Sequence, residues 1–275
     1  MNRIYVITFC CFILFTGCTG FCRGGTSPDG AGARMAGLSM AGTALSGPWA
    51  IMGNQAGFAG INNISAGIYY ENHFLLKETG TRVGYFILPT RTGNFGITVS
   101  SFGFNLYNET RACLSYAKKL GGKFSVGINL NYLHRHIGND YPDAAYVSFD
   151  AGLQTELAPS LILGAHVSNP LGIYIDSYHE KRPPPLFRLG MAWLFSDQII
   201  LSVQADKKLS SPLNIRCGTE IKFHERFFIR AGVTSNPFTN SIGAGFRWNR
   251  WMWDIAGSVH YILGYSLQVS LQYGF

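Results

Sequence analysis

Charged residues are the first candidates for chemistry in this sequence, because many recur at every second position of stretches that alternate in polarity. Alternate residues of a strand point to one face, so these side chains would lie opposite an apolar face. The set comprises Glu71, Arg111, Asp150, Glu156, Arg188, Asp206, Arg216, Glu220, Lys222, Arg230, Arg247 and Asp254. One interpretation is an ion network that satisfies itself, since an unpaired buried charge is costly. The other is a polar path or a site for an anionic or amphipathic solute.

Enzymatic chemistry has little support in the sequence. His134 and His136 would share one strand face, but no further ligand is placed beside them and a zinc site needs three or four ligands. A solvated strand end is the simpler interpretation of this pair. No Ser/His/Asp spacing rises above chance in a chain with many serines. We therefore expect a non-enzymatic protein without catalytic residues, metal or cofactor.

Composition excludes an ordinary charged surface. Charged residues make up 13% of the 275 residues, against about a quarter in typical soluble proteins. The formal net charge is +7, but the basic residues are scattered and form no Lys/Arg run. This pattern argues against a nucleic-acid partner.

The N-terminus has the features of a signal peptide, which we place at residues 1–22. A short basic end is followed by the apolar run IYVITFCCFILF and by small residues. Export is therefore expected, and lipidation at Cys18 stays open as an alternative. The two cysteines far from this leader, Cys113 and Cys217, are predicted to point to opposite faces, so no disulfide is expected.

Strands are the elements that must position the charged set. Residues 123–134, 197–206 and 264–275 alternate polar and apolar side chains without a break, which a helical period would scatter around a cylinder. The same rule predicts about fourteen strands near residues 65–73, 81–89, 94–103, 109–118, 123–135, 145–156, 160–168, 185–195, 197–206, 212–223, 226–234, 240–248, 251–260 and 264–275. No helical crossover fits between them, so the sheet is expected to be an antiparallel meander.

The predicted connections alternate in length. Tight turns at 90–94, 119–123, 157–160, 195–198, 223–226 and 248–251 alternate with longer loops, of which 169–185 is the longest. Short turns at one end and longer loops at the other are typical of bacterial outer-membrane barrels. Aromatic residues crowd the strand ends beside the tight turns: Trp193, Phe195, Phe246, Trp248, Trp251 and Trp253. We therefore predict an all-β transmembrane barrel over residues 65–275, in contact with outer-membrane lipid, whose charged set faces the lumen.

The last residue supports this localisation. Phe275 resembles the C-terminal aromatic signal by which bacterial outer-membrane proteins are recognised for assembly. The barrel assembly machinery is therefore an expected partner. Closure into a barrel would also leave none of these many strands with an exposed edge.

Residues 23–64 differ from the rest of the chain. They are rich in small residues, and ARMAGLSMAGTAL could form a short helix before Ser46-Gly47-Pro48 ends it. So apolar a segment is not expected to hang free on an exported protein. We predict that it packs inside or under the barrel as a plug.

The plug sequence also carries a family resemblance. GARMAGLSMAGTAL followed by NQAGFAGI is similar to the N-terminal signature of the PorV/PorQ family, and HVSNPLGIYI and PPPLFRLGMAWLF are similar to two later segments of that family. The plug positions that match are Arg34, Met35, Asn54, Gln55 and Gly57, with Gln55 departing from the proline usual in the family. The resemblance implies a fourteen-stranded barrel related to the FadL long-chain fatty acid transporter, from Bacteroidetes-type bacteria. Some members serve the type IX secretion system.

Two functions follow as expectations. The first is an accessory or docking role in protein secretion, in which the long loop, with Asn169, Tyr174, Tyr178 and Pro184, would contact secretion-system proteins. The alternative is a FadL-like channel or transporter for a hydrophobic or amphipathic small molecule, whose lumen would open sideways or through the plug. A purely structural role also stays open.

Overall fold

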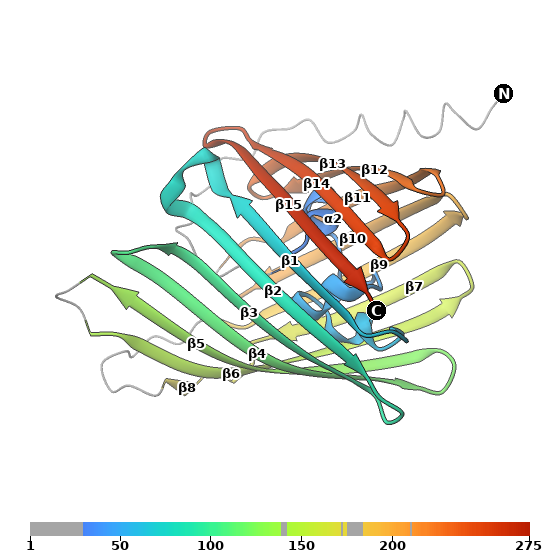
Figure 1. Cartoon of the computed structure of the whole chain (residues 1–275), viewed down its shortest axis with the longest axis horizontal. Helices are drawn as coiled ribbons and strands as arrows, with labels where there is room; N and C mark the ends of the chain where they lie inside the picture. Colours follow the sequence, from blue (N-terminus) through green and yellow to red (C-terminus); the bar gives the residue numbers. More distant parts are fainter. Residues whose placement is uncertain (1–29, 139–141, 172, 175–183, 210) are drawn as a thin grey trace.

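The computed structural model describes residues 30–138, 142–171, 173–174, 184–209 and 211–275. The predicted signal peptide lies outside these ranges. The described chain is dominated by antiparallel strands (Figure 1). The strands are β1 (Ser65–Asn72), β2 (Gly80–Pro89), β3 (Asn94–Phe104), β4 (Tyr107–Leu120), β5 (Phe124–Ile137), β6 (Ala144–Ala158), β7 (Leu161–Ser168), β8 (Ile173–Tyr174), β9 (Leu186–Ser196), β10 (Ile199–Lys208), β11 (Asn214–His224), β12 (Phe227–Ser235), β13 (Phe238–Trp248), β14 (Trp251–His260) and β15 (Gly264–Gly274).

The strands close into one barrel. Consecutive strands pair with each other, β7 pairs with β9, and β15 pairs with β1, which completes the ring. The two-residue β8 is an addition to this ring, because it pairs with β6 at Tyr146 and Val147. The predicted closed antiparallel barrel of about fourteen strands is therefore confirmed.

Three strands are longer than the alternation predicts. β4 and β5 contain 14 residues each and β6 contains 15. Their ladders continue beyond the apolar stretch, for example from Glu109, which pairs with Arg135, to Tyr107, which pairs with Ile137. Backbone pairing needs no apolar side chain, so the hairpin extends where the polarity pattern no longer marks it.

The two ends of the barrel differ. At the short-turn end, six tight connections join the strands, at residues 90–93, 121–123, 159–160, 197–198, 225–226 and 249–250. β1 begins and β15 ends at this end, where the Phe275 amide donates to Ile64 O over 2.7 Å. The opposite, loop end carries the longest connections, including η3 (His73–Leu75) and η4 (Lys77–Thr79) between β1 and β2, together with short ones at residues 105–106, 236–237 and 261–263.

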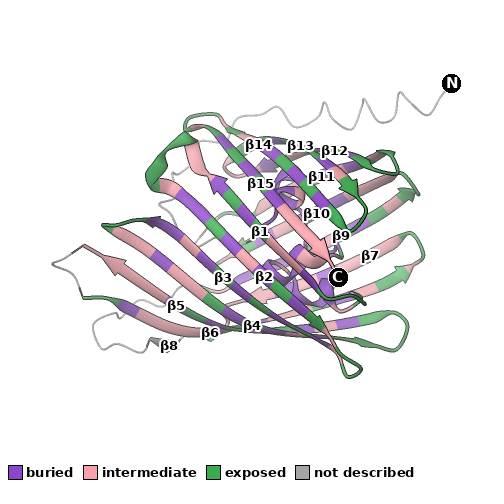
Figure 2. Ribbon diagram, viewed as in Figure 1, coloured by how far each residue is buried: buried purple, intermediate pink, exposed green. Residues whose placement is uncertain are grey.

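Burial alternates along the strands, as the striping in Figure 2 shows. On β1, Tyr69 is 3% exposed whereas Ile68 is 64% exposed. Large apolar side chains cover the outer face in this way, while the inner face holds polar and charged residues. This arrangement is the reverse of a soluble protein and suits a barrel surrounded by lipid.

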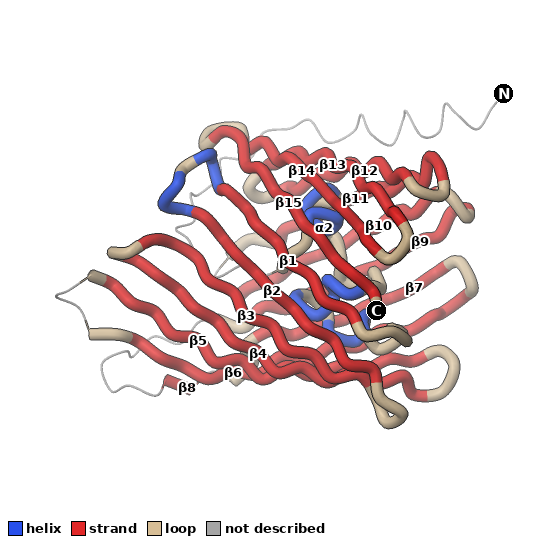
Figure 3. The backbone as a smooth tube through the Cα atoms, in the orientation of Figure 1, coloured by secondary structure: helices blue, strands red, loops and turns tan. Residues whose placement is uncertain are grey.

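Residues 30–61, hereafter the inner segment, lie within the barrel (Figure 3). The inner segment contains α2 (Ala33–Gly37), η1 (Pro48–Met52) and η2 (Gln55–Phe58). Trp49 packs edge-on against Tyr69 and Tyr85 of the barrel wall, with ring centroids 5.9 and 4.7 Å away. No helix in the described part of the chain is long and apolar enough to cross a membrane.

The helix in the inner segment is shorter than the sequence suggests. It ends at Gly37, and Ser39 and Met40 follow with φ of 52° and 61°. The reason is competition from the wall, because Ser39 O accepts from Arg216 over 3.1 Å and the Thr43 amide donates to Gln204 Oε1 over 2.9 Å. Backbone groups that bind the barrel are not available for further helical turns.

Glycines in the wall allow this close approach. A Cβ atom added at Gly232 would lie 2.5 Å from the carbonyl carbon of Leu38, much closer than a van der Waals contact. The mid-strand glycines therefore make room for the backbone of the inner segment.

Candidate functional site

The inner segment is tied to the wall by a four-residue ion network. Arg34 of α2 donates from Nε and Nη2 to the two carboxylate oxygens of Glu220, each over 2.8 Å. Arg230 donates to Glu220 over 2.6 Å and to Asp254 over 2.7 Å. Arg230 is 1% exposed, so this network is within the packed interior. Strands β11, β12 and β14 thus hold the inner segment through charge-assisted hydrogen bonds.

A second network centres on Asp206 of β10. Its carboxylate accepts from Arg216 over 2.7 Å and from the Gln204 amide over 2.6 Å, and Arg188 Nε lies 3.9 Å away. Gln204 Oε1 in turn accepts from the backbone amide and the hydroxyl of Thr43 in the inner segment. The network therefore couples three strands to a second point on the inner segment.

Two further carboxylates anchor networks of the wall itself. Asp150 accepts from Arg111 over 3.3 Å and from Asn131 over 3.0 Å. Glu71 accepts from Tyr69 over 2.7 Å and from Gln268 over 2.9 Å. His73 Nδ1 lies 3.3 Å from Glu71.

The interior is balanced in charge. The four networks contain five arginines and five carboxylates, and buried Glu109 forms a sixth pair with Arg135 over 2.8 Å. Each carboxylate of the networks except Glu71, which has His73 Nδ1 at 3.3 Å, lies within 4 Å of an arginine. The members of the four networks are Arg34, Arg111, Arg188, Arg216 and Arg230 with Glu71, Asp150, Asp206, Glu220 and Asp254. Pairing of this kind is required because unpaired charges are costly away from bulk water.

Three further members of the charged set predicted to face the lumen lie outside these networks. Lys222, Arg247 and Glu156 share the inward register near the short-turn mouth of the barrel, where Glu156 lines a cavity. Arg247 stacks over the Phe228 ring at 5.1 Å, and Glu156 pairs loosely with Lys119 at 3.7 Å. Strand register, which the alternation does not reveal, separates these residues from the interior networks.

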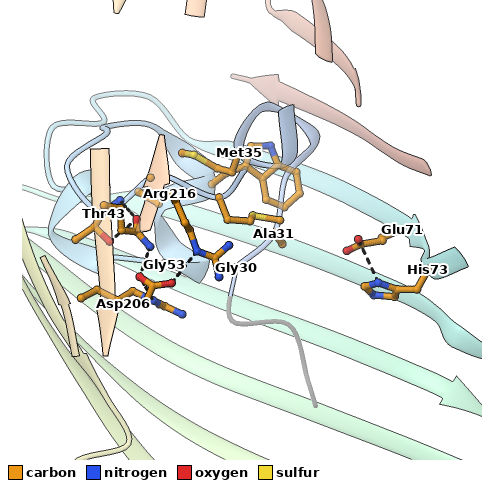
Figure 4. Close-up of a pocket in the computed structure, with 15 residues that line it drawn as sticks. Gly30, Ala31, Met35, Thr43, Gly53, Glu71, His73, Asp206 and Arg216 are labelled. Atoms are coloured by element: carbon orange, nitrogen blue, oxygen red, sulfur yellow. Dashed lines mark hydrogen bonds and ion pairs between the residues drawn. The ribbon is translucent and has the colours of Figure 1, made fainter. Parts of the chain in front are cut away.

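A cavity lies on the loop side of the inner segment (Figure 4). Its volume is about 250 Å³. Met35, Met40, Trp49 and Ala50 of the inner segment contribute an apolar side. The polar side comes from the barrel wall, through Glu71, His73, Arg188, Gln204, Asp206 and Arg216. The cavity can therefore hold a small solute with a substantial apolar part.

A second cavity lies on the short-turn side of the inner segment. Its volume is about 400 Å³, and Gly57 and Ile61 of the inner segment line it together with Lys119, Lys123 and Gln154 of the wall. The inner segment therefore separates two spaces along the barrel axis. An outer hollow beside Ile68 and Gly84 faces away from the lumen, and strand pairing is continuous across it.

The plug residues taken from the family resemblance have distinct positions. Arg34 joins the ion network, Met35 lines the loop-side cavity, and Gly57 lines the short-turn cavity. Asn54 accepts from the Ala56 amide and donates to Thr43 O and Leu153 O. Gln55, 1% exposed, donates to Gly53 O over 3.0 Å, so its side chain closes the local turn.

The remaining predicted sites lie at the two ends of the barrel. The Asn169 amide donates to Asp150, Tyr174 belongs to β8, and Pro184 is exposed. Tyr178 lies outside the described residues. Phe275 packs edge-on against Tyr273, with ring centroids 4.8 Å apart.

The histidine pair has a partner that the sequence did not reveal. His136 Nδ1 lies 2.6 Å from one Asp143 oxygen, and His134 Nε2 lies 3.2 Å from the other. The hydrogen bond with His136 lowers the pKa of the Asp143 carboxyl. No cluster that could hold a metal ion occurs among the described residues. Cys113 and Cys217 are both free thiols.

Comparison with known proteins identifies the fold. No family model and no curated protein matches this chain. The CymD monoaromatic hydrocarbon channel matches with a TM-score of 0.66 and 14% identity, over 90% of this chain and 98% of that chain. The Ralstonia pickettii toluene transporter TbuX matches with a TM-score of 0.66 and 12% identity, over 90% and 99%. A Pseudomonas aeruginosa FadL homologue has a TM-score of 0.66 and 14% identity, over 94% and 100%. The chain shares their fold.

Several residues of the site escaped sequence analysis. Thr43, Gln154 and Gln204 are uncharged, yet they bind the backbone or side chains across the interface between the inner segment and the wall. Their signal in the sequence is weak. Gln154 lies two residues after Gly152, and Gln204 lies two residues before Asp206, so the alternation places both glutamines on the inner face. Many other polar residues of the barrel have the same spacing, so it does not single these two out.

Proposed function

We propose that the protein is an outer-membrane channel for a small hydrophobic or amphipathic molecule. The observation that carries this proposal is the pair of cavities on either side of the inner segment, within a closed barrel whose outer face is apolar. A solute that enters from the loop end meets the loop-side cavity first. It reaches the opposite cavity only if the inner segment shifts.

The similar structures support the same proposal. Two of them are described as a monoaromatic hydrocarbon channel and a toluene transporter. The fold alone does not transfer a substrate at such low identity. The apolar side of the loop-side cavity, with Met35, Met40 and Trp49, agrees independently with a hydrophobic solute.

Orientation follows from the lengths of the connections. Outer-membrane barrels place short turns in the periplasm and longer loops outside. The short-turn end, with Phe275, is then periplasmic, and the loop-side cavity is the one nearer to the outside. Uptake would proceed from the loop-side cavity towards the short-turn mouth.

A reversible lock tests whether solutes pass the inner segment. Ser39 Oγ and Ser241 Oγ lie 2.7 Å apart, so the pair Ser39→Cys with Ser241→Cys would join the inner segment to β13 by a disulfide. The matched control, Ser101→Cys with Asn108→Cys, joins β3 to β4 within the wall, where Asn108 Nδ2 and Ser101 Oγ lie 3.2 Å apart and hydrogen-bond to each other rather than to the inner segment.

Uptake of labelled toluene by cells that carry each variant gives the readout. We expect oxidation to stop uptake through the inner-segment lock, reduction to restore it, and the wall disulfide to leave it unchanged. Full uptake with the lock closed would contradict a path past the inner segment. No protein-dependent uptake in the unmodified protein would contradict the channel function itself.

The secretion role implied by the family resemblance has no structural observation of its own. The loop on which it depends, residues 169–185, lies largely outside the described residues. Deleting that loop and measuring secretion of a type IX cargo would test it.

A further inference from the structure

The periplasmic rim of this barrel carries an excess of positive charge that the protein does not neutralise. Eight cationic side chains lie at the short-turn end against three carboxylates, a formal excess of five charges in a chain whose net charge is +7. The cations are Arg91, Lys118, Lys119, Lys123, Lys222, Arg226, Arg247 and Arg250, and the carboxylates are Glu156, Asp197 and Glu225. The loop end has five cations and three carboxylates among its described residues.

Half of these cations face the outside of the barrel. Lys119 and Lys123 line the short-turn cavity, and Lys222 and Arg247 share the inward register. The four cations exposed to an external partner are Arg91, Lys118, Arg226 and Arg250. Among the described residues, only Lys119 of the eight has an ion pair, its 3.7 Å contact with Glu156. Arg226 and Arg250, at the tips of two neighbouring turns, are exposed. Their backbone carbonyls accept from the neighbouring strands, Arg226 O from the Arg247 amide and Arg250 O from the Gly274 amide. No side-chain hydrogen bond of Arg226 or Arg250 occurs among the described residues.

Aromatic residues place the rim at the level of lipid headgroups. Trp248 and Trp251 flank Arg250, and both rings are on the outer face with 61% and 39% exposed. Trp193 and Trp253 are also exposed on this face, at 44% and 50%. Exposed tryptophans of barrels occupy the membrane interface. The arginines next to them therefore lie where phosphate groups of the inner leaflet are found.

We propose that the short-turn rim binds the headgroups of anionic phospholipids in the periplasmic leaflet. The cations are spread over four turns rather than gathered in one pocket, which suits a ring of lipids better than a single protein partner. Arginine can bind a phosphate through two donors at once. This inference rests on the membrane orientation given under the proposed function.

Bromine-labelled lipids provide the test, because bromine quenches tryptophan fluorescence on contact. Four of the five tryptophans lie on the outer face at the short-turn end, whereas Trp49 is 2% exposed inside the barrel. The full-length protein in vesicles would be titrated with brominated phosphatidylglycerol or brominated phosphatidylcholine. We expect phosphatidylglycerol to be preferred by about threefold at low salt. At ~0.5 M salt, where charges are screened within a few ångströms, we expect no preference between the two lipids.

Two variants with equal charge loss locate the effect. Arg226→Gln with Arg250→Gln should abolish the preference, whereas Lys77→Gln with Arg82→Gln, both exposed at the loop end, should retain it. Equal quenching by the two lipids in the unmodified protein would overturn the proposal. A preference that survives in the rim variant would also overturn it. The salt titration on unmodified protein keeps the test valid if the rim variant does not fold.

Toluene uptake separates this proposal from the channel function. The rim variant should transport toluene normally, since Arg226 and Arg250 line neither cavity. Loss of lipid preference with uptake intact supports the rim proposal alone. Absence of uptake in every protein, with the lipid preference present, would instead contradict the channel proposal.

Discussion

The interior of the barrel and its short-turn rim hold charge in opposite ways. In the four interior networks, five arginines meet five carboxylates, and Glu220 accepts hydrogen bonds from both Arg34 and Arg230. On the rim, eight cations meet three carboxylates, and most of these side chains are exposed. The difference shows that burial forces charges to pair, whereas an exposed surface leaves them free for partners.

The largest effect is expected when an interior carboxylate is removed. Glu220→Gln would leave Arg34 and Arg230 without their shared anion in a buried site, which destabilises a protein by about 3–5 kcal/mol. Glu156→Gln is the matched change on the rim, where both partners are about half exposed, and should alter stability by less than about 1 kcal/mol. The gel shift between heated and unheated samples, followed against temperature, measures both. Equal effects at the two positions would remove the distinction between interior and rim.

Filling a wall glycine tests how tightly the inner segment is packed. Gly232→Val places side-chain atoms where Leu38 and Ser39 now lie, so we expect a loss of about 1–3 kcal/mol and displacement of the inner segment. Gly84→Val is the control, because a Cβ atom there meets nothing within 4 Å. Protease cleavage within residues 30–61 reports the displacement. Protection of that segment in the Gly232 variant would show that the packing tolerates the added volume.

Removing the cation of the inner segment should loosen it while leaving the wall intact. In Arg34→Leu, Glu220 keeps its 2.6 Å bond to Arg230, so we expect a smaller loss of about 1–3 kcal/mol. The lumen should open more often, which planar-bilayer recordings would detect as higher conductance. Unchanged conductance would mean that the Gln204, Ser241 and Asn54 contacts hold the inner segment without Arg34.

The smallest effect concerns an exposed ion pair at the loop end. The pKa of Asp143 is lowered by His136, so its stabilisation of the hairpin is present above the ordinary aspartate pKa of about 3.9 and is lost as pH falls through the lower folded value. Hydrogen exchange of residues 134–138 and 143–145 should therefore rise below about pH 4, and Asp143→Asn should remove that dependence. The same acid response in the Asn variant would assign it to another group.

Sequence alternation predicted the barrel well because the outer face of each strand is apolar and suits lipid, whereas the inner face is polar. The residues Glu220, Arg230 and Asp254 were placed inward by their two-residue period, and all three lie in the interior network. The same period placed Lys222 and Arg247 inward, but strand register puts them at the mouth. Alternation gives the face of a residue and says little about its height along the barrel axis.

The inner segment was less predictable. Its small residues indicated close packing, but a helix through residues 33–45 was expected where only Ala33–Gly37 is helical. The wall supplies hydrogen bonds to Ser39 and Thr43 from residues more than 150 positions away in the sequence. Local helix propensity contains no information about hydrogen-bond partners at that separation in the sequence.

The sequence by itself determined the strands, their number and the face on which each side chain lies, because alternation follows directly from a wall between lipid and an enclosed lumen. Only the tertiary structure decided that Arg34 meets Glu220, that Asp143 joins the two histidines, and that two cavities lie on opposite sides of the inner segment. These features depend on register and on contacts between distant strands, which appear only when the ring closes.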